Sequence, residues 1–351
     1  MSRPSSIPHS RPSLGEAEAQ AAADVIRAGW IAQGEKVAEF ERALAKVAGQ
    51  GEGVAVSSGT AALYLALAAL GVGSGDEVIV PSYVCAALWH AVRQTGARPV
   101  LVDIDPATFN AAPPAVHRAV TARTKAIIVP HMFGLPADIT ALKVSGIPLI
   151  EDCAQTLGAT VNGRPVGSLG DMTICSFYAT KLLATGEGGM VLGRNESLLT
   201  RIRAARHYDE SDDLAPAFNY KMTDIQAAVG LRQLHDLPAF IARRRAIADR
   251  YSAALRGLKA EPPGNRPDGG HVYYRYVIRV AEPVESAVQR FAEYGVMCRR
   301  PVFRPLHRYL GLIGFPETDR AWEQTLSVPL YPSLTDAEVE RVIGAMKVVL
   351  A

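Results

Sequence analysis

The chain has 351 residues, with 37 basic against 35 acidic side chains and a formal net charge of +2. This balance gives no electrostatic reason to expect nucleic acid or a membrane surface as a partner, so we expect small molecules instead. The N-terminal residues MSRPSSIPHSRP lack the apolar core of a signal peptide, and no apolar run reaches the roughly 18 residues of a membrane span. The four cysteines show no metal-ligand spacing. We therefore expect a cytoplasmic enzyme with reduced thiols, no disulfide framework and no metal site.

The first two thirds of the chain alternate between helical and extended patterns. Residues 15–29 read as a helix, and the apolar stripe at Val37, Phe40, Leu44 and Val47 predicts a second one. Short apolar strands follow, separated by helical or loop stretches: GVAVS, DEVIVP, RPVLVDI, KAIIVP, IPLIEDC and TICSF. This alternation predicts an α/β fold with a mostly parallel central sheet between helices, and ligands at the carboxyl ends of its strands.

The remaining chain has a different organisation. Residues 223–255 predict a long helical arm with one interruption near Pro238. The turn-rich segment EPPGNRPDGG then leads to a strand over 271–280, a helix over 284–294 and a last helix over 336–349. We predict two domains: a large one over 1–258, with the N-terminal helices and the helical arm, and a small α+β domain over 259–351.

Several signatures of common enzyme classes do not occur. The glycine-rich GVGSGD follows a helix and precedes a strand, the reverse of a phosphate-binding loop, and we interpret it as a turn. The sequence has no Walker motif, no paired-histidine zinc motif and no serine-hydrolase elbow. Hydride transfer, phosphoryl transfer and zinc-dependent hydrolysis are therefore disfavoured.

One lysine has unusual neighbours, in the stretch CSFYATKLLATGEGGMV. Most lysines are solvated surface charges, and that is the ordinary interpretation of any one of them. Lys181, however, follows a buried strand and precedes a glycine run that permits close approach of the backbone to a ligand. This placement predicts an amine at a strand end, facing a cleft.

Other polar residues fall at the ends of the same set of strands. Ser58, Gly59 and Thr60 lie between a strand and a helix, where free backbone N–H groups attract a phosphate, although a plain helix cap is the simpler interpretation. Asp152 ends an apolar strand, and a carboxylate buried there needs a cationic partner. The alternative interpretation is an ordinary acid in a loop. A phosphate cradle, a buried acid and a cleft lysine together fit pyridoxal 5′-phosphate (PLP), with the lysine as its imine partner.

Beyond these residues, the sequence resembles the DegT/StrS-type family of fold-type-I, PLP-dependent nucleotide-sugar aminotransferases nearly from end to end. The matching segments, in order, are GWIAQGEKVAEFE, VSSGTAALYLAL, GDEVIVPSY, RTKAIIVPHMFG, IEDCAQTLGA, GRPVGSLGD, SFYATK, GEGG and FNYKMTDIQAA. Any one segment is modest evidence, whereas their order and spacing are specific. The resemblance implies a PLP-transferase-like large domain and a transaminase activity in amino-sugar biosynthesis.

The resemblance assigns roles to individual residues. Lys181 would hold the cofactor as an imine and later move the substrate proton, and Asp152 would keep the ring nitrogen protonated. Gln155 matches the position that hydrogen-bonds the ring hydroxyl. The phosphate contacts would come from Gly59, Thr60 and Ser176, beside Ser58.

The resemblance also implies partners and a shared site. Asn219, in FNYKM, matches a residue that reaches the cofactor phosphate of a neighbouring subunit, so a homodimer with shared active sites is expected. Glutamate, the usual donor, would leave its amino group on the cofactor as pyridoxamine 5′-phosphate (PMP). A keto group on a nucleotide-linked deoxysugar would then accept it.

Several positions depart from the family pattern. Cys85 stands where an aromatic residue commonly stacks on the cofactor ring, and Trp89, one helical turn further, is either a substitute or a core residue. Lys221 stands where arginine is more usual. Four basic residues near the C-terminus either meet a nucleotide diphosphate or face solvent: Arg299, Arg300, Arg304 and His307.

Two alternative functions stay open from the sequence. The first is a related PLP-dependent sugar dehydratase, but relatives with that chemistry replace the lysine, usually with histidine, so Lys181 favours transamination. The second is a PLP-binding regulator without turnover. An attached DNA-binding segment would favour such a regulator, and none is evident in the sequence.

Overall fold

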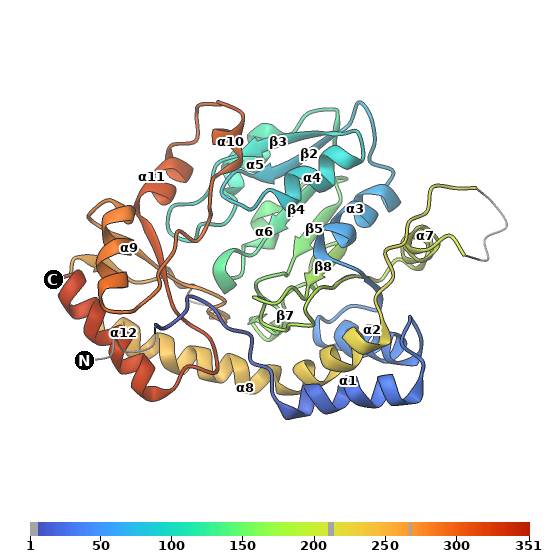
Figure 1. Ribbon diagram of the computed structural model, residues 1–351. Coiled ribbons are helices and arrows are strands. Elements are labelled where there is room, and N and C mark those ends of the chain that lie inside the picture. The colour runs from blue at the N-terminus through green and yellow to red at the C-terminus, as the bar shows by residue number, and fades with distance from the viewer. Residues whose placement is uncertain (1–5, 210–213, 267–268) are drawn as a thin grey trace.

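A computed structural model describes residues 6–209, 214–266 and 269–351 (Figure 1). The first five residues and part of the EPPGNRPDGG joint lie outside the described residues. The helices are α1 (Glu16–Ala28), α2 (Glu35–Val47), α3 (Gly59–Ala69), α4 (Ala87–Gln94), α5 (Pro113–Ala119), α6 (Ile139–Leu142), α7 (Glu196–Arg206), α8 (Asp224–Ala254), α9 (Val284–Glu293), α10 (Leu306–Tyr309), α11 (Pro316–Gln324) and α12 (Asp336–Val349). The strands are β1 (Glu52–Val56), β2 (Glu77–Pro81), β3 (Arg98–Val102), β4 (Thr124–Pro130), β5 (Leu149–Asp152), β6 (Thr160–Val161), β7 (Arg164–Pro165), β8 (Met172–Ser176), β9 (Gly189–Gly193), β10 (Ala260–Glu261), β11 (Tyr276–Val280) and β12 (Thr325–Val328).

The central sheet has seven strands in the order β1-β9-β8-β5-β4-β2-β3. The pairs from β8 to β3 are all parallel, and β9 runs antiparallel to both of its neighbours, β1 and β8. A short hairpin of β6 and β7 lies between β5 and β8 in the chain. The prediction of an α/β fold with a mostly parallel sheet is confirmed.

Alternation along the strands sends side chains to two separate layers. In β1, Val54 and Val56 pack with α3, α4 and α7, whereas Ala55 between them packs with α2 and α8. At the other edge of the sheet, α5 and α6 cover the second face through Val116 and Ile139. Because both faces are covered, the middle residues of the strands are apolar, as the sequence pattern indicated, and charged side chains such as Glu52 and Arg98 occur only near strand ends.

The helix α8 is unbroken, so the expected interruption near Pro238 is wrong. Proline has no N–H to donate to the preceding turn, yet the helix runs for 31 residues through it. Packing on both sides of the proline accounts for this continuity. Leu237 and Ile241 are buried against the large sheet layer, and Ile247 and Tyr251 are buried in the C-terminal core. In Figure 1, α8 lies along the lower edge and joins the two halves of the molecule.

The C-terminal part is a three-stranded antiparallel sheet in the order β10-β11-β12, packed with α9 and α12. Its core also includes Ile7 from the N-terminal segment, which pairs with Val296. The two predicted helices occur at Val284–Glu293 and Asp336–Val349. The division of the chain at residue 258 stays a prediction.

The strand expected over 271–280 begins only at Tyr276. Residues 271–275 instead follow an irregular path beside the loop after β4, where the amide of Val272 donates to Gly134 and that of Arg275 to Phe133. This path brings Tyr274 and Arg275 beside the carboxyl end of the central sheet. Within the described residues, no helix is both long and apolar enough to cross a membrane.

Candidate active site

Eight of the nine predicted site residues line one cavity of about 260 Å³. It lies at the carboxyl ends of β5 and β8, in front of the first turn of α3. The eight are Ser58, Gly59, Thr60, Cys85, Asp152, Gln155, Ser176 and Lys181. The ninth, Asn219, does not line this cavity and is exposed on the segment between α7 and α8.

The first turn of α3 presents free donors to the cavity. Ser58 caps the helix, with its hydroxyl oxygen 3.1 Å from the amide nitrogen of Ala61 that donates to it. Among the described residues, no protein atom accepts a hydrogen bond from the amide of Gly59 or of Thr60. A Cβ on Gly59 would lie 2.7 Å from the Cβ of Ser176. Glycine thus keeps open a donor-lined hollow that suits a phosphate group.

Asp152 ends β5 with a side chain that is almost buried, and register places it between Pro130 of β4 and Ile174 of β8. Burial raises the pKa of this carboxyl group above its ordinary value, and a hydrogen bond from the Ala154 amide and attraction to Lys181 act against that rise. A buried carboxylate with one backbone donor gains most from a ligand that brings a cationic N–H, such as a pyridinium ring.

Lys181 lies in the loop that joins β8 to β9. The loop is folded back on itself, because the amide of Ala179 donates to Gly186 and that of Lys181 donates to Tyr178 at 2.8 Å. The half-buried side chain places its ammonium nitrogen 5.4 Å from the ring centroid of Tyr274. The lysine therefore lines a cavity, where the sequence predicted an amine facing a cleft, and the aromatic ring beside it was not predicted.

Tyr274 lies beside Lys181 without lining the cavity, and the sequence did not reveal it. Burial raises its pKa, but attraction to Lys181 and Arg275, together with hydrogen bonds from Thr180 and Arg275, outweighs burial and lowers the pKa to about 8. The residue was predicted within a regular strand, and no motif distinguished it. Its position depends on the irregular path of residues 271–275, which the alternating pattern does not encode.

Gln155 is held by a loop residue with a left-handed backbone. Its side-chain oxygen accepts a hydrogen bond from the Phe133 amide at 2.8 Å, and Phe133 has φ of 58°. This bond fixes which end of the amide is the acceptor. The Nε2 group makes no hydrogen bond to the described residues, so it can donate to a ligand hydroxyl.

The two residues considered for ring stacking separate in the structure. Cys85 lines the cavity and is exposed, whereas Trp89 lies outside it and packs against the core formed with α3 and α4. The tryptophan is therefore partly buried against the core, outside the cavity, and does not replace the missing aromatic residue. Lys221, at the other departure from the family pattern, forms an ion pair with Asp209.

The C-terminal basic residues are mostly engaged by the protein itself. Arg300 lies 4.1 Å above the ring of Trp322 and forms an ion pair with Glu285. Arg304 lies over Tyr309, and His307 is buried against Ser82 and Asp319. None of these, nor Arg299, lines the cavity that holds Lys181.

Behind the cavity, His131, Glu151 and Cys153 are close enough together to resemble a metal site. The His131 Nδ1 atom accepts a hydrogen bond from the Ala137 amide, so its Nε2–H donates to Glu151 at 3.1 Å. Glu151 also accepts from backbone amides of the loop before β8. Both ring nitrogens are therefore used within the protein, and the cluster is a buried hydrogen-bond network.

A cleft lysine, a buried carboxylate and a donor-lined helix start, all at the carboxyl ends of a mostly parallel sheet, define the class of PLP-dependent transferases. The donor set fits this cofactor, because the hollow suits its phosphate and Asp152 suits its ring nitrogen. The chain belongs to the DegT/DnrJ/EryC1/StrS aminotransferase family, which matches residues 12–347.

Relatives extend this likeness over nearly the whole chain. The spore coat polysaccharide biosynthesis protein SpsC of Bacillus subtilis (strain 168) is 36% identical, over 97% of this chain and 96% of that protein. The sugar aminotransferase Spr1654 of Streptococcus pneumoniae, solved in PMP and PLP forms, superposes with a TM-score of 0.92 at 31% identity in the PMP form, covering 98% of this chain and 97% of that one. DesI, solved in the presence of its TDP-sugar product, gives a TM-score of 0.91 at 31% identity, over 99% of this chain and 93% of that one.

Proposed function

We propose that this aminotransferase moves the amino group of L-glutamate to the keto group of a nucleotide-linked deoxysugar. The observation that carries the proposal is the cavity in which eight residues, predicted separately from the sequence, lie together. The cofactor is PLP, with PMP as the form that carries the amino group between the two half-reactions. When bound, it supplies the electron sink on which transamination depends.

Lys181 and Asp152 carry the chemical roles in this proposal. The amine of Lys181 holds the cofactor covalently at rest and moves the proton at the substrate carbon once displaced. Its half-buried position beside Tyr274 limits the rotamers that the amine can adopt. The carboxylate of Asp152 pairs with the cofactor ring nitrogen, and its burial makes that pairing strong because little water competes.

The other cavity residues position the cofactor. The amides of Gly59 and Thr60 and the hydroxyl of Ser176 bind the phosphate, and Ser58 keeps the helix start in place as its cap. Gln155, whose side-chain oxygen is already bonded to Phe133, would donate through Nε2 to the ring hydroxyl. The thiol of Cys85, which lines the same cavity, would cover part of one ring face.

Two relatives support a nucleotide sugar as the acceptor, and the common donor of the family supports glutamate. DesI was solved with a TDP-sugar product, and the name of SpsC refers to polysaccharide biosynthesis. A keto-deoxysugar nucleotide is the acceptor that a sugar aminotransferase needs. Glutamate is the common donor of the family that the sequence resembles.

The functional unit in this proposal is a homodimer with shared sites, working in the cytoplasm. Asn219 lies outside its own cavity and is exposed, between Phe218 and Tyr220, whose amides are bonded to α7 at Ala205 and Arg206. An anchored but outward-facing asparagine suits contact with the cofactor phosphate of a second subunit. The described cysteines are all free thiols, which suits a reducing compartment.

The proposal is tested by following the absorbance of the bound cofactor. Purified protein loaded with PLP should show the band of the lysine-bound form, and L-glutamate should convert it to the PMP band. Lys181→Ala should lack the first band, while Lys143→Ala, on the exposed turn after α6, should keep it. Absence of the lysine-bound band in the unaltered protein would refute the role of Lys181. Conversion by another amino acid but not by glutamate would refute only the proposal that glutamate is the amino donor.

A further inference from the structure

A second cavity, of about 720 Å³, lies between the N-terminal segment, α9 and the loop that carries Lys181, and among the described residues it shares no lining residue with the first cavity. Its lining includes Thr180, the residue before Lys181, and three arginines, Arg275, Arg299 and Arg300. Glu285 is the one acid among the described lining residues, and it is paired with Arg300. Positive charge is therefore in excess in this cavity, which favours an anionic ligand.

Arg275 is firmly held in this cavity but is not neutralised. Its Nη1 atom lies 3.0 Å from the Nδ1 atom of His9, and its Nη2 atom lies 3.4 Å from the Tyr274 hydroxyl oxygen. The described chain places no carboxylate within ion-pair distance of its guanidinium, and its Nε–H donates to no described residue. A half-buried guanidinium normally has an acidic partner, so this one has the capacity to bind a carboxylate.

His9 does not change this charge balance. Burial, together with the nearby positive charges of Arg275 and Arg299, lowers the pKa of the His9 ring to about 2, so the ring is neutral at physiological pH. The other ring nitrogen lies 2.9 Å from the Ser327 hydroxyl oxygen. His9 therefore contacts the Arg275 guanidinium as a neutral ring and helps to fix its orientation.

Arg275 and the reacting amine share one aromatic ring. The Arg275 guanidinium carbon lies 4.8 Å from the ring centroid of Tyr274, and the Lys181 ammonium nitrogen lies 5.4 Å from the same centroid. In an amino acid, the amino group and a carboxylate are separated by only a few bonds. In a nucleotide sugar, by contrast, the sugar ring separates the reacting carbon from the diphosphate.

We propose that Arg275 binds a carboxylate group of the amino donor while the donor's nitrogen lies at Lys181. This inference rests on the proposed aminotransferase function and assigns the donor subsite within it. The guanidinium can offer Nε–H and an Nη–H together to one carboxylate, a geometry that lysine cannot reproduce. Arg299, more exposed on the same cavity, adds attraction without a fixed geometry.

The test compares Arg275→Gln and Arg275→Lys with a matched control, Arg279→Gln. Arg279 lies four residues further along the chain, in β11, where it packs over Phe109 and does not line the cavity. Each protein is loaded with PLP, and its conversion to PMP is followed with L-glutamate and with L-alanine. With whichever of the two is the better donor for the unaltered protein, Arg275→Gln should lower kcat/KM about 10- to 100-fold. Arg275→Lys should lose less, and Arg279→Gln should match the unaltered protein. Inhibition by UDP and by dTDP should be the same in all four proteins.

Calorimetry with glutarate gives a second readout that needs no turnover. Glutarate has two carboxylates and no amino group, so it should bind the PLP-loaded protein and bind Arg275→Gln at least about 10-fold more weakly. Equal binding by the two proteins, or no binding by either, would overturn the assignment. The assignment would also be overturned if Arg275→Gln weakened inhibition by UDP or dTDP and left kcat/KM for the amino donor unchanged. If no amino acid converts the unaltered protein, the proposed function fails, and the glutarate result still decides the role of Arg275.

Discussion

Burial of Asp152 has opposite consequences for stability and for activity. Its pKa is raised by burial, so the folded, cofactor-free protein holds this proton more tightly than the unfolded chain does. Folding stability therefore falls as pH rises past the ordinary range of an aspartate, and the loss persists at neutral pH. We expect Asp152→Asn to raise the melting temperature of the cofactor-free protein at pH 7 but not at pH 3.

The same substitution should lower the rate of the glutamate half-reaction by on the order of 100-fold or more, because a neutral amide cannot stabilise a cationic ring nitrogen. Calorimetric melting and stopped-flow absorbance measure the two effects on one preparation. Misfolding would lower both quantities together. A variant that melts earlier at pH 7 would contradict the burial argument.

Tyr274 should titrate near physiological pH in the cofactor-free protein. Burial raises its pKa, but the neighbouring Lys181 and Arg275 more than offset this and lower it to about 8. The resulting stabilisation is fully present above the ordinary tyrosine pKa and is lost as pH falls through about 8. Tyrosinate absorbance should increase between pH 7 and 9, and Tyr274→Phe should remove that step. Tyr276→Phe is the control, because burial raises the pKa of Tyr276 and takes it out of this range.

The junction of α3 and β8 leaves no room for a side chain. A methyl group on Gly59 would lie 2.7 Å from the Ser176 Cβ and 3.0 Å from its hydroxyl oxygen, so helix and strand would have to separate. We expect Gly59→Ala to weaken PLP binding by about 10-fold, the scale of moderate overpacking, as measured by fluorescence titration. Gly73→Ala, in the turn after α3 with nothing within 4 Å of its Cβ, should bind PLP normally. Normal PLP binding by Gly59→Ala would contradict this prediction and would show that α3 and β8 can separate enough to hold a methyl group.

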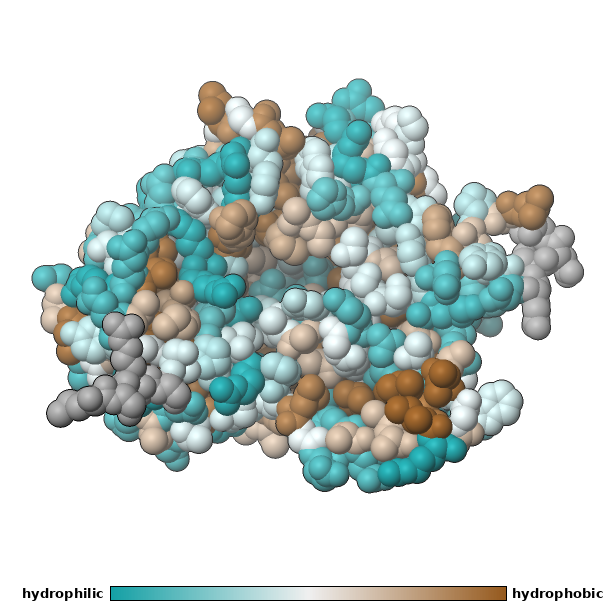
Figure 2. Space-filling model, in the orientation of Figure 1, coloured by the Kyte–Doolittle hydropathy of each residue, from teal (hydrophilic) through white to brown (hydrophobic). Residues whose placement is uncertain are grey.

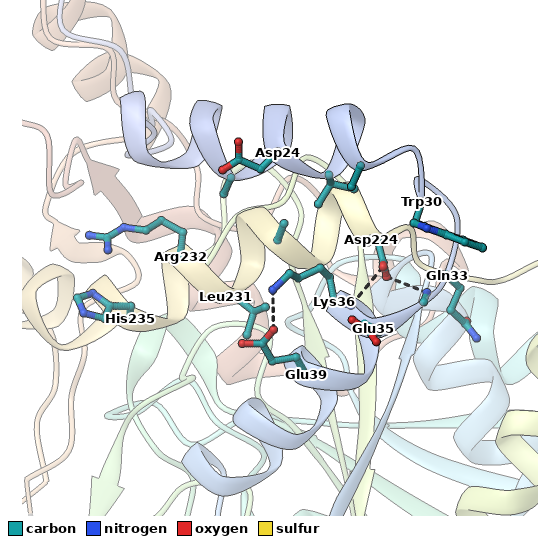
Figure 3. A pocket seen from close by; sticks show the side chains of 15 residues that line it. Asp24, Trp30, Gln33, Glu35, Lys36, Glu39, Asp224, Leu231, Arg232 and His235 are labelled. Atoms are coloured by element: carbon teal, nitrogen blue, oxygen red, sulfur yellow. Dashed lines mark hydrogen bonds and ion pairs between the residues drawn. The ribbon is translucent and has the colours of Figure 1, made fainter.

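The helix α2 is capped by a residue from α8 rather than by its own chain. The Asp224 carboxylate accepts from the amides of Gly34 at 2.8 Å and Lys36 at 3.2 Å (Figure 3). It also accepts from the amide of Val37 at 2.9 Å. We expect Asp224→Ala to lower the free energy of unfolding by about 2 kcal/mol, since three donors lose a charged acceptor. Asp24→Ala, on the same groove but exposed, should change it by less than about 0.5 kcal/mol in the same denaturant titration. Equal effects would exclude a special role for the cap.

The sequence predicted elements where local pattern alone decides the structure. Short apolar runs between glycine and polar turns predicted the central strands. Asp152 and Lys181 were found because the first ends such a strand and the second follows one. Their meeting in one cavity follows from parallel topology, which places successive carboxyl ends at one edge of the sheet. This part of the site was therefore predictable.

Contacts between distant segments were not predictable in the same way. The capping bonds of Asp224 join residues 187 to 190 positions apart, and nothing near Gly34 in the sequence indicates its acceptor. Pro238 has a strong local preference to end a helix, which packing of α8 on two cores overcame. Tyr274 and Arg275 reach the site because residues 271–275 leave the strand pattern to bond with the loop after β4.

At the scale of the whole molecule, several large apolar side chains are left in solvent. Ile26 is 59% exposed, Trp30 82% and Ile31 52%, beside a groove of about 980 Å³ between α1, α2 and α8. Figure 2 shows apolar surface gathered at the right-hand end of α1 in this view. Leu214, on the same segment between α7 and α8 as Asn219, is fully exposed. These surfaces are consistent with the homodimer that we propose.

Mixing two inactive variants tests whether the active site is shared. In a dimer of Lys181→Ala with Asn219→Ala, one site carries both changes, and the other has its own Lys181 and the asparagine of the first subunit. Co-refolding or co-expression in equal amounts should therefore restore about a quarter of the unaltered activity, because half of the dimers have one intact site of two. If Asn219 served the cavity of its own subunit, every mixed site would lack one residue and no activity would return. Full activity of Asn219→Ala on its own would remove the residue from the site altogether.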